Sequence, residues 1–265
     1  MRKTEKPEVK ISVTTSVDTT TWAFGKQVLE IFCNVDARLM PERVGGCEPV
    51  KTPVENVAAC EQHWAPDATI DGPYGRSFVK RDFLWKRTKA IKSDGHMMHT
   101  ARNKLGNLKL GWLTFGAAPD KKTEWDRLFS RLCVAMQPKF ATLHLFTDIE
   151  ARANAFSAES DANFGTNDFF YGVPGHALEN RGLANLAWAT FFGEELAVEV
   201  DVQKLRDNGF RVEAIGKGFL VTLTSKLFDV MDEFAVFSTR RVVAKQLFKP
   251  GLFRIAEEPK FEAFK

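Results

Sequence analysis

The sequence has few cysteines and no long apolar run. Four cysteines in 265 residues, none in a C-x-x-C pair, are too few for a disulfide framework or a structural zinc site, so buried free thiols are expected. No apolar run reaches the roughly 18 residues of a membrane span. Residues 1–8 are polar and charged, unlike the start of a secretory signal. We therefore expect a cytoplasmic protein without a membrane segment.

The sequence also has no large excess of one charge, and it contains little tyrosine. The net charge is only +3, and such a near balance does not by itself predict a nucleic-acid partner. The aromatic residues are 23 Phe and 6 Trp against 2 Tyr, which favours a buried aromatic core over a Tyr-rich binding surface. With 44% hydrophobic residues, the composition is that of a globular protein.

The hydrophobic periodicity predicts strands and helices in irregular order. Strands are expected over 9–17, 108–117, 141–147 and 186–192, and a hairpin of 210–215 with 219–224 around Gly216–Gly218. Helices are expected from about 19 to 39, briefly over 54–64, and over 78–92, 120–136, 201–208 and 229–248. This order lacks the regular alternation of a doubly wound sheet. We predict an α+β fold with mixed or antiparallel sheets and packed helices.

A short internal similarity bears on the domain organisation. Residues 112–116 (WLTFG) and 188–193 (WATFFG) share a strand pattern that ends in glycine, with a helix predicted after each. If the similarity is real, the chain consists of two related halves; if it is chance, the chain can be one compact domain. We divide it into an N-terminal α+β part of unknown type, 1–97, and a C-terminal α+β part, 98–265.

A search for catalytic and metal-binding patterns finds only isolated residues. His96 and His99 would face opposite sides of a strand, and no H-E-x-x-H motif or cysteine pair completes a metal site. His144 and Asp148 could form an acid–base pair, but no nucleophile motif accompanies them. Gly216–Gly218 lacks the third glycine of a phosphate-binding loop. We therefore predict no catalytic residues, no metal, no cofactor and no enzymatic activity.

Basic residues are concentrated between Lys80 and Lys109. A basic helix over 78–92 carrying Trp85 would permit phosphate contacts with base stacking, so nucleic-acid binding is the alternative function. A solvated basic face is the more common explanation of such a segment, because the acidic stretch 148–168 offsets its charge. A nucleic-acid partner is therefore not expected.

The C-terminal half resembles a known family. The segment 182–193 (GLANLAWATFFG), the hairpin 209–224 and the closing amphipathic helix are similar to bacterial immunity proteins of polymorphic-toxin and type VI secretion systems, in outline the immunity-protein-52-like group. The resemblance covers roughly residues 98–253, whereas 1–97 match nothing we can name. It implies a catalytically inert α+β protein that binds its cognate toxin in the producing cell and blocks the toxin's active site or its access to substrate.

Acidic residues suggest where such a toxin would dock. Carboxylates are concentrated in 148–168 and in 194–201, and both could steer a basic toxin surface into place. The first segment also carries aromatic residues near its acids, which is the usual composition of a tight interface. We predict that Asp161, Asp168, Phe169 and Tyr171 contribute to partner binding. The alternative is that both segments are solvated acidic loops.

Overall fold

The computed structural model describes residues 6–72, 75–102, 106–147, 183, 185–253 and 258. These residues form two compact units. The N-terminal unit is Ile11–Pro138, and the C-terminal unit combines Met1–Lys10 with Lys139–Lys265. Strand β1 (Glu8–Thr15) contributes residues to both. The boundary predicted at 97/98 lies within strand β7 (Ser93–Met98), and the division into an N-terminal and a C-terminal part stays a prediction.

The N-terminal unit is built on an antiparallel sheet with strand order β10-β7-β6-β2-β3. Its strands are β2 (Arg43–Gly45), β3 (Thr52–Pro53), β6 (Phe83–Arg87), β7 and β10 (Gly111–Ala117). Two small ribbons accompany it, β4 (Asp67–Gly72) with β5 (Gly75–Lys80) and β8 (Ala101–Arg102) with β9 (Leu108–Lys109).

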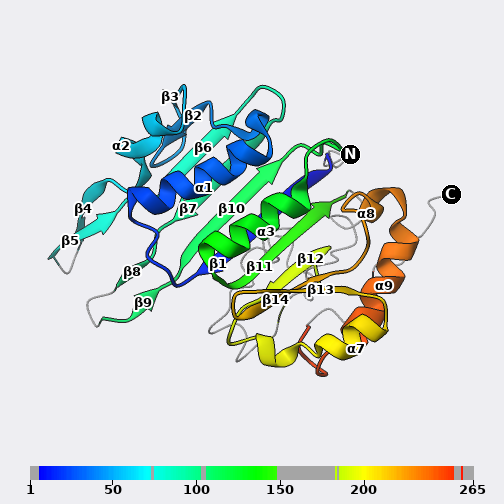
Figure 1. Ribbon diagram of the computed structural model, residues 1–265. Coiled ribbons are helices and arrows are strands. Elements are labelled where there is room, and N and C mark those ends of the chain that lie inside the picture. Colours follow the sequence, from blue (N-terminus) through cyan, green and yellow to red (C-terminus); the bar gives the residue numbers. More distant parts are fainter. Residues whose placement is uncertain are drawn as a thin grey trace, which may run out of the picture. The chain divides into compact units, whose positions relative to one another are not determined.

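Helices cover one face of this sheet (Figure 1). They are α1 (Trp22–Val35), α2 (Glu61–Trp64) and α3 (Trp125–Met136), with 3-10 turns η1 (Ala37–Leu39) and η2 (Ala58–Cys60). Thr21 caps α1 by accepting the Phe24 N–H. Phe32 of α1 packs against Trp85 of β6 and Phe115 of β10, with ring centroids 5.8 and 4.7 Å away. Burial of these aromatic side chains holds α1 on the sheet.

The C-terminal unit has a second antiparallel arrangement of strands, in the order β13-β14-β12-β11. The strands are β11 (Pro138–Phe146), β12 (Ala189–Phe192), β13 (Arg211–Ile215) and β14 (Gly218–Thr222). The helical segments are η3 (Ala197–Glu199), α7 (Val202–Asp207), α8 (Asp229–Asp232) and α9 (Phe234–Gln246). Phe237 of α9 lies 5.7 Å from the ring of His144 in β11, so α9 packs onto the sheet.

The α+β class with antiparallel strands and packed helices is confirmed. Among the described residues, none of the helices combines the length and apolar character needed to cross a bilayer. The four cysteines are free, but only Cys60 and Cys133 are buried, whereas Cys33 is half-buried and Cys47 is exposed. The expectation that all four thiols are buried was therefore wrong.

The prediction of a helix over 78–92 was also wrong, because this region contains the end of β5 and the whole of β6. In β6 the side chains of Phe83 and Trp85 are buried, whereas Lys86 is exposed. This alternation has the period of a strand, and pairing with β2 and β7 stabilises it.

The helix predicted over 229–248 is interrupted. Asp229–Asp232 forms α8 and Phe234–Gln246 forms α9, because Glu233 between them has non-helical dihedral angles (φ −134°, ψ 48°). Glu233, the residue at this break, lines the pocket described below.

Candidate functional site

The four residues predicted to bind a partner, Asp161, Asp168, Phe169 and Tyr171, lie outside the described residues. So does the whole acidic segment 148–168, which contains these two carboxylates and Asp148. The predicted docking site therefore stays a prediction.

The second acidic segment, 194–201, is described, and its carboxylates already have partners within the chain. Glu194 pairs with Lys217 at 2.8 Å, Glu195 pairs with Lys139, and Glu199 pairs with Lys249 at 3.2 Å. Asp201 accepts the Lys204 N–H at 3.0 Å and caps α7, as the sequence predicted. This segment therefore offers little uncompensated negative charge to a basic partner.

The basic segment 80–109 does not present Trp85 at its surface, as the nucleic-acid alternative assumed. Trp85 is only 1% exposed, so its ring cannot stack on a base. Arg87 donates hydrogen bonds to the carbonyl oxygens of Met40 and Ala90, and Lys80 pairs with Asp67 at 2.9 Å. Arg87 and Lys80 therefore hold local structure, and Trp85 belongs to the core.

The three histidines considered in the sequence analysis, His96, His99 and His144, each have different hydrogen-bond partners. His96 is partly exposed and its Nε2 lies 2.8 Å from Asp82. His99 is buried, with Nε2 2.6 Å from the Trp64 carbonyl oxygen and Nδ1 3.3 Å from the Thr19 hydroxyl. His144 is completely buried and its Nδ1 accepts the Trp188 N–H at 3.0 Å. In the described part of the chain, no three His, Cys, Asp or Glu side chains form a cluster able to hold a metal ion.

The buried position of His99 predicts a pH-dependent stability. Burial lowers the pKa of His99 below 6.5, and the hydrogen bonds from its ring offset this shift only in part. The unfolded chain then binds a proton more tightly than the folded chain. The contribution of neutral His99 is fully present above about pH 6.5 and is lost as the pH falls towards the folded-state pKa.

Urea titrations between about pH 7.5 and 5 are expected to show the free energy of unfolding falling with pH. His99→Gln should flatten this dependence, because it removes the group whose pKa is shifted. His96→Gln is the matched control, since His96 is partly exposed. Equal pH slopes for His99→Gln and the unaltered protein would contradict the assignment.

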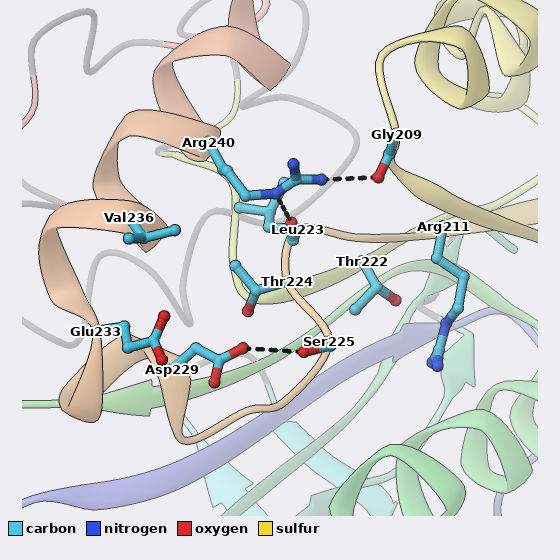
Figure 2. Close-up of a pocket in the computed structure, with 10 residues that line it drawn as sticks. All are labelled: Gly209, Arg211, Thr222, Leu223, Thr224, Ser225, Asp229, Glu233, Val236 and Arg240. Atoms are coloured by element: carbon cyan, nitrogen blue, oxygen red, sulfur yellow. Dashed lines mark hydrogen bonds between the residues drawn. The ribbon is translucent and has the colours of Figure 1, made fainter.

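A pocket of about 520 Å³ lies in the C-terminal unit, where the end of β14 meets α8 and α9. Figure 2 shows Arg211 and Arg240 towards the β13 side and Asp229 and Glu233 on the α8 side. The hydroxyl-bearing residues Thr222, Thr224 and Ser225 also line it. Cations and carboxylates are thus separated across one cavity.

Arg240 builds the wall of this pocket. From α9 its Nε donates to the Leu223 carbonyl oxygen at 2.5 Å, and its Nη2 donates to the Gly209 carbonyl oxygen at 2.8 Å (Figure 2). The guanidinium also lies 4.5 Å from the ring centroid of Phe210. Arg240 therefore fixes α9 to the two segments that flank β13 and β14.

The residues of this pocket were not identified from the sequence. Gly216–Gly218 was correctly assigned to a hairpin turn, but Arg211 and Arg240 were not singled out. The only local signal was the acidic run Asp229, Asp232 and Glu233 at the start of a predicted helix. That run did not reveal the break at Glu233.

The structure is thus that of an α+β protein in which His99 and His144 are buried and hydrogen-bonded to the main chain. No family model and no curated protein matches the chain. Among solved structures, it is similar to the Pseudomonas aeruginosa T6SS protein PA0821, with a TM-score of 0.56 and 12% identity. The alignment covers 98% of this chain and 78% of that one. At this identity the likeness shows a shared fold, and it includes residues 1–97, for which the sequence suggested no relative.

Proposed function

We propose that this chain is an immunity protein, not an enzyme, that binds a cognate bacterial toxin or effector and neutralises it by occluding the toxin's active site. The observation that carries the proposal is the fold shared with a T6SS protein over 98% of the chain. The sequence of residues 98–253 also resembles immunity proteins, independently of the fold. Both point to the same secretion-linked class of bacterial proteins.

The buried histidines support binding rather than turnover. His99 and His144, the residues closest to an acid–base or metal role in the sequence, are 4% and 0% exposed and make hydrogen bonds to the main chain. A substrate in solution would not reach either ring. Their positions are those expected of histidines that stabilise a core.

For the docking surface, we retain Asp161, Asp168, Phe169 and Tyr171. The competing acidic segment 194–201 has its glutamates in ion pairs with lysines of the same chain. A basic toxin surface would have to displace those lysines, and this lowers the gain from steering. Aromatic anchors beside carboxylates, as in 161–171, are the better match to a binding hot spot.

The direct test is co-expression with the product of the neighbouring gene in a bacterial host. We expect the two proteins to co-purify, the neighbour alone to inhibit growth, and this chain to restore growth. No complex and no protection would contradict the proposed function.

If a complex forms, Asp168→Lys combined with Tyr171→Ala should weaken it by about 30-fold or more, because hot-spot losses are about 2 kcal/mol or larger. Glu194→Lys is the matched charge-reversal control, since Glu194 pairs with Lys217 on the surface. The control should change the affinity by no more than about five-fold. Unchanged affinity and salt dependence in the double variant would place the docking site elsewhere while leaving the immunity function intact.

A further inference from the structure

The pocket beside β14 is lined by side chains of opposite charge. Arg211 contacts Glu213 through its Nε at 3.0 Å, and neither of its terminal nitrogens makes a hydrogen bond to a described residue. Across the pocket, the carboxylate of Glu233 has no hydrogen bond or ion pair among the described residues. These two side chains therefore have unused capacity for a ligand.

The other polar groups of the pocket are already engaged, with one exception. Arg240 binds two carbonyl oxygens, and Asp229 accepts the Lys226 N–H at 3.0 Å. Thr222 is 2% exposed, and its hydroxyl has no hydrogen-bond partner among the described residues. That hydroxyl oxygen is itself buried, so it is not available to a ligand in the pocket.

Size and charge together restrict the class of ligand. A volume of about 520 Å³ is within the range of small-molecule sites. A purely anionic ligand would be repelled by Glu233 and Asp229, and a purely cationic one by Arg211 and Arg240. Leu223 and Val236 also line the pocket, so a ligand can bury apolar groups there as well. A ligand with one charge of each sign satisfies both sides.

We propose that this pocket binds a zwitterionic ligand of the amino-acid or short-peptide class, whose carboxylate pairs with Arg211 and whose ammonium group pairs with Glu233. The guanidinium offers a carboxylate two parallel hydrogen bonds, and the glutamate accepts from an ammonium group. This inference does not rest on the proposed immunity function.

The probe is the dipeptide Ala-Ala, compared with its N-acetyl derivative, which lacks the ammonium group, and its C-terminal amide, which lacks the carboxylate. NMR titration of the full chain should give saturable shifts for Ala-Ala at residues of β14 and α9. Each derivative should bind about ten-fold more weakly, since each loses one charged pair. Free alanine and lysine in parallel titrations distinguish an amino-acid site from a peptide site.

Variants of the two charged residues show which one pairs with the ammonium group of the ligand and which one pairs with its carboxylate. In Glu233→Gln, Ala-Ala and its N-acetyl derivative should bind equally, whereas the amide should remain weaker. In Arg211→Gln the pattern should reverse, with the amide now equal to Ala-Ala. Glu195→Gln, away from the pocket lining, is the matched control and should leave all affinities unchanged. The absence of saturable shifts with any zwitterion, or equal binding of all three dipeptides to the unaltered protein, would overturn the proposal.

Discussion

Replacing Trp64 with alanine is expected to lower the free energy of unfolding by about 3–5 kcal/mol. Its side chain is 1% exposed and packs against Phe83 and His99, with ring centroids 4.9 and 5.2 Å away. Its Nε1 also donates to the Thr19 carbonyl oxygen at 2.8 Å. The substitution would open a cavity and remove this hydrogen bond. Urea denaturation monitored by circular dichroism measures the loss.

Phe78→Ala is the control for this prediction. Phe78 also carries a large aromatic ring, but it is 80% exposed on the β4–β5 ribbon. Its removal should change the free energy of unfolding by no more than about 0.5 kcal/mol. A loss at Trp64 as small as the one at Phe78 would show that Trp64 is not part of the core that links α2 to the sheet.

Elements with a clear local pattern were predictable from the sequence. The alternation of apolar residues located β1, and the cap at Asp201 located α7. The hairpin of β13 and β14 followed from two apolar runs around a glycine turn. In each case the signal lies within a few consecutive residues and agrees with the tertiary environment.

The basic region was predicted to be a helix but forms strands, because its charged residues fit a helical period whereas its buried residues fit a strand period. Lys80, Lys86, Arg87 and Lys89 gave a polar pattern compatible with an exposed helix face. The decisive information is that Phe83 and Trp85 are buried on the same side, two residues apart. The burial of Trp85 depends on partners from α1 and β10, and that of Phe83 on Trp64 of α2, all distant in the sequence.

The pocket was not predictable, for a related reason. Its charged residues come from β13, from α8 and α9, and from the turn at Glu233. Arg211 and Arg240 are 29 positions apart (240 − 211), and only the folding of α9 back towards β14 brings them to one cavity. No motif of fixed spacing describes such a set of residues.

Gly95→Ala is expected to lower the free energy of unfolding by about 3 kcal/mol, an effect of overpacking rather than of cavity formation. Gly95 of β7 lies opposite Trp85 of β6, and an added Cβ would lie 2.0 Å from the indole Cζ2 atom. The indole is buried, so it cannot move aside without disturbing Phe32 and Phe115. Gly45→Ala is the matched control, because the nearest atom to its Cβ would be 3.4 Å away.

A double-mutant cycle distinguishes this steric clash with Trp85 from a general requirement of β7 for glycine at position 95. Trp85→Leu removes the ring atoms that the new methyl group would meet. Because the indole Nε1 has no hydrogen-bond partner in the described part of the chain, this substitution breaks no hydrogen bond there. Gly95→Ala should therefore cost at least about 1 kcal/mol less in the Trp85→Leu background than alone, which chemical denaturation of the four proteins would measure. If the cost is the same in both backgrounds, the indole is not the obstacle, and β7 requires glycine for its backbone alone.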